Sequence, residues 1–571
     1  MPVMHDIPTP ANPVRSRLVR LSVIVVTILG ALVRIWYQRG RSFAGDEVGT
    51  LIGLGATYRY LVTHYVNWLS MNYYIVGLKF VADTFGRNPW ILTAPSLLGN
   101  VAAIPLTYLV GRRFAPERIA AMAAAIVAFN PYVIDFAPLI RAYSIHLALS
   151  LLTILFYERW RDSRSWRAGT ACAITALFMC LNHMVGVYTV AAIAALETIS
   201  LCADLKTGAW PALRARFSLI VPMLAIAVLL ACSVSLYYAE LKMVNAQFTT
   251  RPPGNVSYIV PMTALFFGGE WSGFAYGILI VLGCAGVVRA HLVRPAVAAF
   301  FLAPVILMAM QGVAHLSSAY ARFDIGMVPF CALLVAAGIS FLCDWMPWGS
   351  WISGTACALL LALFSTPALL AMQREKIATP WRKVHDYLAV TVRPGDMVVG
   401  SILDLLSVAG TFLDTPDPLT RAVPSINTHP SPLATLLGPG AFRLSQIALF
   451  RYDDFSQLPD AAFTSSTVFS IASDSKIHSQ TPTHHQGSIQ VLAYTGPKAQ
   501  VLAHMAADLA ATTRDKRDPV FISYYLFLGS LSKALNRPTD AEHYDRMALE
   551  SLLALEHQWQ GIPYRMLPDR G

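Results

Sequence analysis

Long apolar runs recur through the first two thirds of this chain, and they constrain its fold more than any other feature. The 571 residues are 55% hydrophobic and only 13% charged, with a mean hydropathy of +0.51, whereas soluble proteins carry about 25% charged residues. About eleven runs approach the roughly 20 residues that a helix needs to cross a bilayer. We therefore expect an α-helical polytopic membrane protein. The predicted spans are residues 18–37, 89–111, 117–134, 141–157, 168–184, 185–203, 217–238, 273–289, 296–314, 323–343 and 351–372.

Basic residues gather in short clusters between these spans. The clusters precede the first span and follow the second, fourth, sixth and eighth, so all of them share one side if the first helix runs from inside to outside. Because basic loops stay in the cytoplasm, this pattern predicts the cytoplasmic (inner) membrane, a cytoplasmic N-terminus and an extracytoplasmic C-terminal domain. The basic residues behind the net charge of +10 then orient the protein in the membrane, and the charge does not indicate a nucleic-acid partner. The clusters are Arg15, Arg17 and Arg20; Arg112, Arg113 and Arg118; Arg159, Arg161, Arg164 and Arg167; Lys206, Arg214 and Arg216; and Arg289 and Arg294.

The N-terminus and the cysteines add two further expectations. The apolar run at 18–37 has no A-x-A-like cleavage site, which predicts an uncleaved signal anchor. The eight cysteines lie in or beside apolar stretches without zinc-ligand spacing, so neither a disulfide framework nor a structural metal site is expected. Few acids occur in the predicted outer loops, which disfavours a multi-carboxylate cage but leaves room for one shared divalent cation.

The character of the chain changes after residue 372, where the apolar spans stop. The segment VRPGDMVV, ending at Val399, has the pattern of a turn followed by a strand, which predicts the start of an α/β domain. The region 498–556 is typical of helices, and part of it resembles one tetratricopeptide-like hairpin, too little for a solenoid. The predicted domains are a transmembrane domain at 1–372, an extracytoplasmic α/β domain at 373–497 and a helical segment at 498–571.

Two adjacent carboxylates, Asp46 and Glu47, stand just past the first span, in the string FAGDEVGT. A charged side chain at the centre of a membrane helix costs about 2.5 to 3.5 kcal/mol on insertion scales, so acids near a membrane are retained mainly where they meet water, a partner or a substrate. The alternative is that they begin a solvated loop. The other polar stretches near helix ends fall in loops predicted on the same outer face, which indicates an active site open to the non-cytoplasmic side.

The order of these features resembles the GT-C superfamily of membrane glycosyltransferases, and more closely the bacterial relatives of protein O-mannosyltransferases and of lipid A aminoarabinose transferase. No single motif carries the resemblance, which extends over about residues 18–400 and includes the segment PWRKVHDYL after the last span. The ordered set consists of Asp46–Glu47 after the first span, APSLL from Ala94, GRR from Gly111, RAYS from Arg141, Asn182–His183 and YARF from Tyr320.

The resemblance implies a hexosyl- or pentosyltransferase that moves a sugar from a polyprenyl-phosphate donor to a hydroxyl acceptor, with inversion at the anomeric carbon. The acceptor would be an envelope glycolipid, a polysaccharide or a protein. Asp46 matches the family's catalytic carboxylate, a natural base for the acceptor proton, with Glu47 beside it to orient acceptor or water. Arg322 matches a family position suited to the lipid phosphate, and Arg141 is a second candidate. The implied substrate-binding residues are His183, Asn182, Tyr143, Tyr320, Asp135 and Asn72.

Three departures from the family concern specificity more than reaction class. Leu139 stands where relatives often carry an acid, Thr93 where many have arginine, and Asn72 lies where a His-Pro-Pro is common.

Several alternatives stay open at this point. Arg322 could snorkel to headgroups, Arg141 could serve a structural ion pair, His183 could be a satisfied polar residue, and the tyrosines could belong to an interfacial belt. A transporter or flippase of lipid-linked substrates would also place ionisable residues in the bundle, but it predicts inverted repeats and midplane sites. A membrane-anchored scaffold would leave Asp46, Arg141 and Arg322 with no reason to share a face.

Overall fold

The computed structural model divides the chain into two compact units. The first contains Met1–Arg39, Gly53–Phe85 and Trp90–Gln373, and the second contains Gly40–Ile52, Gly86–Pro89 and Arg374–Gly571. The domain boundaries predicted from the sequence stay a prediction. The structure describes residues 13–39, 57–63, 72–86, 89–183, 185–207, 210–235, 270–289, 325–343, 349–377, 397–400, 467–473, 483–486, 489–511 and 522–558, and single residues at 47, 50, 54, 384, 387, 388, 390 and 391.

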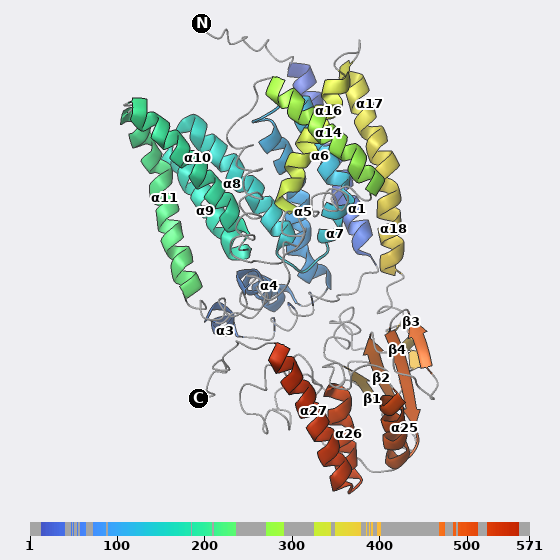
Figure 1. The fold of residues 1–571 in the computed structure, drawn as a ribbon. Helices are drawn as coiled ribbons and strands as arrows, with labels where there is room; N and C mark the ends of the chain where they lie inside the picture. Colours follow the sequence, from blue (N-terminus) through green and yellow to red (C-terminus); the bar gives the residue numbers. More distant parts are fainter. Residues whose placement is uncertain are drawn as a thin grey trace. The chain divides into compact units, whose positions relative to one another are not determined.

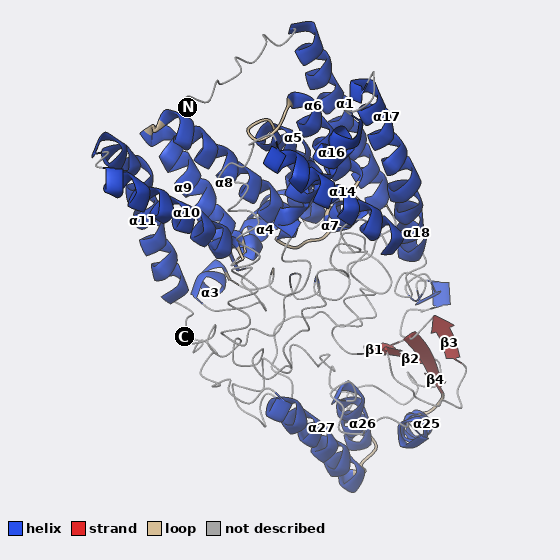
Figure 2. Cartoon of the chain, turned by 45° about the horizontal axis from the view of Figure 1, so that its top comes forward, coloured by secondary structure: helices blue, strands red, loops and turns tan. Residues whose placement is uncertain are grey.

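The described part of the first unit is helical (Figures 1 and 2). Helices α8 (Tyr143–Ser163), α9 (Trp166–Asn182), α10 (Gly186–Thr207) and α11 (Trp210–Ser235) pack together. A second group contains α1 (Pro13–Gln38), α6 (Glu117–Phe129), α14 (Glu270–Arg289), α16 (Val328–Cys343) and α17 (Gly349–Leu360). Short helices α3 (Tyr58–Thr63) and α4 (Asn72–Phe85) follow the first long helix. The remaining described elements of this unit are α5 (Pro89–Gly111), α7 (Pro131–Phe136), the π-helix η3 (Leu361–Ser365) and α18 (Thr366–Ile377).

The predicted spans fall on these helices, except for 296–314, which lies outside the described residues. The total of eleven crossings therefore stays a prediction. Within the described chain, five helical stretches are long and apolar enough by themselves to cross a membrane: Ser16–Gln38, Trp90–Gly111, Ala215–Ser233, Ile325–Cys343 and Ile352–Arg374.

The predicted span at 117–134 is wrong as a single helix. Helix α6 ends at Phe129, Asn130 has an extended backbone, and α7 begins at Pro131. Proline disfavours a helical conformation in the residue before it, and the Asn130 side chain caps the new helix by accepting the backbone N–H of Val133 at 2.9 Å. A 13-residue helix is only about 20 Å long, so α6 is shorter than a hydrocarbon core of about 30 Å.

Helices α14 and α16 approach each other closely at two glycines. A Cβ on Gly283 would collide with the backbone carbonyl of Leu334, and one on Gly338 would collide with that of Leu279. Small residues allow backbones in a membrane to approach and gain van der Waals contact where no hydrophobic force acts. These two positions therefore define how α14 and α16 pack.

One end of the first unit collects the arginine-rich turns. Ser16 of α1 donates to Glu117 at 3.3 Å, and Arg113, after α5, pairs with Asp162 of α8 at 2.6 Å. Ser218 of α11 donates to the carbonyl of Arg164, between α8 and α9, at 3.1 Å. The basic clusters at the start of α1 and around the α5–α6, α8–α9 and α10–α11 connections thus lie together, as expected from their spacing. Their location in the cytoplasm stays a prediction.

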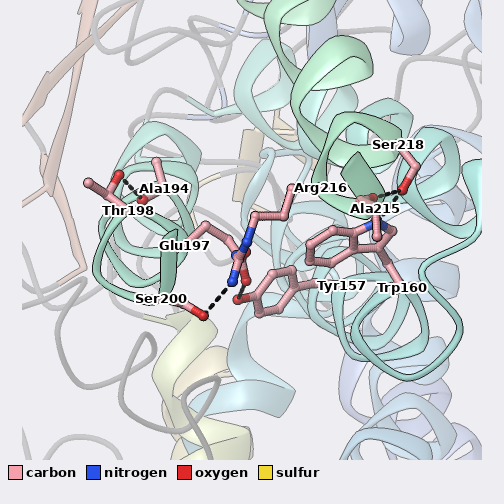
Figure 3. A network of polar contacts seen from close by, with 9 residues as sticks. All are labelled: Tyr157, Trp160, Ala194, Glu197, Thr198, Ser200, Ala215, Arg216 and Ser218. Carbon is pink, nitrogen blue, oxygen red and sulfur yellow. Dashed lines mark hydrogen bonds and ion pairs between the residues drawn. The ribbon is translucent and has the colours of Figure 1, made fainter. Parts of the chain in front are cut away.

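A buried polar network ties α8, α10 and α11 together at this same end (Figure 3). Arg216 of α11 forms an ion pair with Glu197 of α10 and donates to Ser200 at 2.6 Å. Tyr157 of α8 donates to Glu197 at 2.6 Å. Charges away from water need such partners, and removing one partner of a buried pair costs about 3 to 5 kcal/mol. These charged residues therefore have a structural role, because they join the three helices.

In the described part of the second unit, a four-stranded sheet occurs together with the helices α25, α26 and α27. The strand order is β1-β2-β4-β3, with β1 parallel to β2 and the other neighbours antiparallel. Strand β1 lies partly within VRPGDMVV, where a strand is expected, and α26 packs on α27 as a helical hairpin. The elements are β1 (Met397–Gly400), β2 (Thr467–Ser473), β3 (Thr483–Gln486), β4 (Ile489–Thr495), α25 (Lys498–Ala511), α26 (Ile522–Ala534) and α27 (Pro538–Gln558).

Candidate functional site

The structure describes part of the predicted site. Arg141, Tyr143, Asn182, His183 and Asp135 belong to the first unit, at the end of the helices away from the arginine-rich turns. Glu47 is 2% exposed and belongs to the second unit, and Asn72 is the first residue of α4. The predicted residues Asp46, Tyr320 and Arg322 lie outside the described residues. Their roles stay predictions.

The segment that begins α8 is fixed by hydrogen bonds from two neighbouring helices. Ser96 of α5 donates to the carbonyl of Arg141 at 3.1 Å, and Asn182 of α9 donates to the carbonyl of Ala142 at 2.9 Å. Tyr74 of α4 shares a hydrogen bond with Ser96 at 3.1 Å. All these groups are buried. The backbone around Arg141 is therefore held rigidly, and Asn182, predicted to bind substrate, contacts this segment.

A row of rings lies next to this backbone segment. The ring of Tyr143 lies 5.1 Å from Phe136 and 5.5 Å from His183, and the ring of His183 lies 5.4 Å from His146. Tyr143 and His146 share one face of α8, because side chains three positions apart are neighbours on a helix. His183 follows α9 with an extended backbone, and its Nδ1 accepts the backbone N–H of Val185 at 3.3 Å. This hydrogen bond favours the neutral tautomer with the proton on Nε2.

Asp135 and Thr93 both face the end of α1. Tyr37 donates to the Asp135 carboxylate at 2.7 Å, and the Gln38 amide donates to the Thr93 hydroxyl. Tyr37 is fully buried, in a cluster with Ile134 and Leu369. Thr93, which replaces an arginine common in the family, therefore joins α1 to α5.

Sequence reasoning missed a buried network centred on Arg34. This fully buried arginine of α1 donates from Nε to Asn100 of α5 at 2.6 Å and from its two Nη atoms to the carbonyls of Ala128 at 2.7 Å and Val127 at 3.2 Å. These carbonyls belong to the last turn of α6, which the break at Asn130 leaves without helical partners. An arginine in an apolar span was the available signal.

Asn100 extends this network to the start of α8. Its amide donates to the carbonyl of Val133 at 2.9 Å and to the hydroxyl of Ser144 at 3.0 Å. Ser144 in turn donates to the carbonyl of Phe136 at 2.8 Å. The side chains of Arg34 and Asn100 thus hold the α6–α7 break and the turn before α8 in one arrangement, immediately beside Tyr143.

The electrostatics of this region favour an anion. Arg141 is buried and lies two residues before the first residue of α8, whose N-terminus carries a partial positive charge from aligned peptide dipoles. Both effects point to anion binding at this helix end. Among the described residues no group of three or more His, Cys, Asp or Glu side chains is placed to hold a metal ion.

Comparison with solved structures finds proteins to which this chain is similar. ArnT from Cupriavidus metallidurans, solved in the apo state and bound to undecaprenyl phosphate, is similar over 82% of this chain and 97% of its own, with a TM-score of 0.50 and 14% identity. AglB from Archaeoglobus fulgidus covers 74% of this chain and 62% of its own at a TM-score of 0.41 and 13% identity. The sequence matches no protein-family model and no curated protein.

The similarity to ArnT shows that this chain has the GT-C fold, as the ordered motifs predicted. With its long apolar helices, it is a membrane protein.

Proposed function

We propose that this protein is a GT-C glycosyltransferase, which transfers a sugar from a polyprenyl phosphate to a hydroxyl acceptor outside the cytoplasmic membrane. The observation that carries the proposal is the fold shared with ArnT over nearly the whole length of that enzyme. One ArnT structure holds undecaprenyl phosphate, a ligand with a phosphate head on a long apolar chain. The buried Arg141 at the N-terminus of α8 supports the same ligand chemistry here.

The proposed reaction needs a base and an anion-binding group. The Asp46 carboxylate takes the proton of the acceptor hydroxyl while that oxygen forms a bond to the anomeric carbon of the sugar. The bond between this carbon and the lipid phosphate breaks, and its electron pair leaves with the phosphate. Arg322 and Arg141 stabilise the charge that develops there. Glu47 orients the acceptor, and one divalent cation is compatible with this arrangement.

The remaining predicted residues shape the sugar pocket in this proposal. Tyr143 and His183 present adjacent rings, and Asn182 holds the backbone beside them. Tyr320 and Asn72 line the rest of the substrate path, and Asp135 lines its end next to α1. The acceptor is a glycolipid, a polysaccharide or a protein of the cell envelope.

A deletion strain tests the proposal whichever sugar the enzyme transfers. We expect mass spectrometry of its envelope glycolipids and glycoproteins to show loss of one sugar mass, and the wild-type gene to restore it. The Asp46→Asn variant keeps size and polarity but removes basicity, so transfer should fall about 10²- to 10⁴-fold, the range for general-base catalysis. Binding of undecaprenyl phosphate to the purified variant should change little.

Asp162→Asn is the matched control, since this carboxylate lies at the opposite end of the helices. The deletion strain that expresses Asp162→Asn should regain the lost sugar mass fully. If Glu47→Gln is inactive while Asp46→Asn is active, the general base is Glu47 instead of Asp46. Full activity of both variants would contradict the proposed mechanism.

A further inference from the structure

A groove of about 460 Å³ lies at the arginine-rich end of the first unit, where the end of α5, the last turns of α8 and the first turns of α9 meet. We call it the basic groove and define it by its charged lining residues Arg113, Arg159, Asp162 and Arg167. It is separate from the candidate site, which lies at the other ends of α8 and α9. None of the predicted catalytic or substrate-binding residues lines it.

The charges of the basic groove are unbalanced. Three guanidinium groups face one carboxylate, which leaves a net charge of +2. Arg113 forms an ion pair with Asp162 at 2.6 Å. Within the described part of the chain, Arg159 and Arg167 form no ion pair, and both are exposed. Arg159 lies over the ring of Phe156, which holds its guanidinium at the rim. Two cations therefore remain available for an anionic ligand.

The N-terminus of α9 opens into the same groove. Ser165 caps this helix by accepting the backbone N–H of Ala168 at 3.3 Å, and Ser163 donates to the Ser165 hydroxyl at 3.0 Å. Both serines line the groove. The positive end of the helix dipole adds to the field of the arginines. Guanidinium groups, hydroxyls and a helix N-terminus are together the groups that bind phosphate in proteins.

The exposed side chains around the groove indicate which kind of phosphate-bearing ligand fits it. Trp166, the first residue of α9, is 54% exposed, and tryptophan concentrates at the membrane–water interface. The groove continues along α9 over Ala168 and Ala171, and Ile174 and Phe178 of the same helix expose large apolar side chains beyond them. A ligand here meets cations at the interface and apolar surface below.

We propose that the basic groove binds the headgroup of an anionic phospholipid, with its acyl chains along the outer surface of α9. Basic pockets between membrane helices on the cytoplasmic side are suited to such headgroups. The bound lipid would hold α8 and α9 together at the end opposite the sugar chemistry. This inference does not rest on the proposed glycosyltransferase activity.

Native mass spectrometry of the purified, delipidated full chain tests the proposal, with phosphatidylglycerol and phosphatidylcholine as probes. We expect the wild type to retain phosphatidylglycerol preferentially. The double variant Arg159→Gln/Arg167→Gln should bind it about 30-fold more weakly, because each basic residue at a membrane surface contributes roughly fivefold in affinity. Each single variant should show about a fivefold loss, which keeps the test valid if the double variant misfolds.

The control variant Arg17→Gln/Arg20→Gln removes two exposed arginines from α1 at the same end of the unit but outside the groove. Its affinity for phosphatidylglycerol should stay within about twofold of wild type. Equal losses in the two double variants would show a diffuse charge effect and overturn the site. Displacement of the lipid by millimolar inorganic phosphate, or no preference for phosphatidylglycerol, would overturn the assignment to a lipid headgroup.

Discussion

Asn100 of α5 connects its helix to three others, α1, α7 and α8. It accepts a hydrogen bond from Arg34 of α1 and donates to the carbonyl of Val133 in α7 and to Ser144 of α8. A buried polar group that loses its partner costs about 1 to 3 kcal/mol, and more when it is charged. The buried Arg34 guanidinium makes this position sensitive to substitution.

We therefore expect Asn100→Ala to lower the free energy of unfolding by at least about 2 kcal/mol, because it removes the Nε partner of Arg34. Asn100→Asp keeps an acceptor for that guanidinium and should retain much more of the stability. Thermal unfolding in detergent measures both. Thr107→Ala, which removes a hydroxyl bonded only within α5 at the carbonyl of Ala103, is the control. Equal midpoints for Asn100→Ala and Thr107→Ala would exclude this role of Asn100.

Arg322 is the residue expected to bind the donor phosphate. Replacing it by alanine should weaken binding of the polyprenyl-phosphate donor by about 1.5 to 3 kcal/mol, the contribution of a hydrogen bond to a charged group. Lysine should restore only part of this loss, because it lacks the planar fork of arginine. Isothermal titration or native mass spectrometry with undecaprenyl phosphate gives the affinity. A loss no greater than that of Arg17→Ala would assign Arg322 to headgroup contacts.

At the scale of elements, the contact between α14 and α16 predicts that alanine has different effects on stability at two glycines of α14. Gly283→Ala should destabilise the protein, because the new Cβ collides with the carbonyl of Leu334. Gly277→Ala, six residues earlier in α14, meets no described atom within 4 Å and should be neutral or stabilising by up to about 1 kcal/mol. Thermal unfolding in detergent separates the two. A lower midpoint for Gly277→Ala than for Gly283→Ala would contradict the observed packing.

Most of the long helices of the first unit were predictable because they coincide with apolar runs near the length that a bilayer requires. Helix α6 is the exception. Asn130 and Pro131 end this helix inside a stretch that stays apolar to Ile134, so an average of hydropathy over the stretch does not reveal the break. The dipeptide is visible in the sequence, but the carbonyls it frees are satisfied only by Arg34, which is 93 and 94 positions away. Such a partner is set by tertiary packing and leaves no local signal.

Within the candidate site, the ordered motifs pointed to Arg141, Tyr143, Asn182 and His183, whose roles stay predictions. The structure places Asn182 against the carbonyl of Ala142, next to Arg141, and the ring of Tyr143 beside that of His183. His146 was missed, although it lies three positions after Tyr143 on the same helix face. Its place in the candidate site follows from its contact with the ring of His183, which comes from the end of α9 and is distant in sequence.

At the scale of the whole molecule, the spacing of the arginine clusters predicts that the region after residue 372 lies outside the cytoplasm. Alkaline phosphatase fused after Gly400 should therefore be active, and a cytoplasmic fluorescent reporter at the same point should be dark. A fusion after Arg164, in an arginine-rich turn, should give the reverse pair of results. A fluorescent reporter and an inactive phosphatase after Gly400 would invert the topology and the proposed outer active site.

The buried Arg34 also has a consequence for how the ribosome and the translocon must handle this protein. Helix α1 is synthesised first, yet the groups that satisfy its guanidinium, Asn100, Val127 and Ala128, follow 66, 93 and 94 positions later. Until then, lateral release of α1 into lipid would leave this guanidinium without its partners. The cost of a charge reaches about 2.5 to 3.5 kcal/mol at a helix centre and is smaller for Arg34, which lies near the C-terminal end of α1. The nascent α1 is thus favoured to wait beside the translocon until α5 and α6 emerge, so that the first span made is released together with its partners.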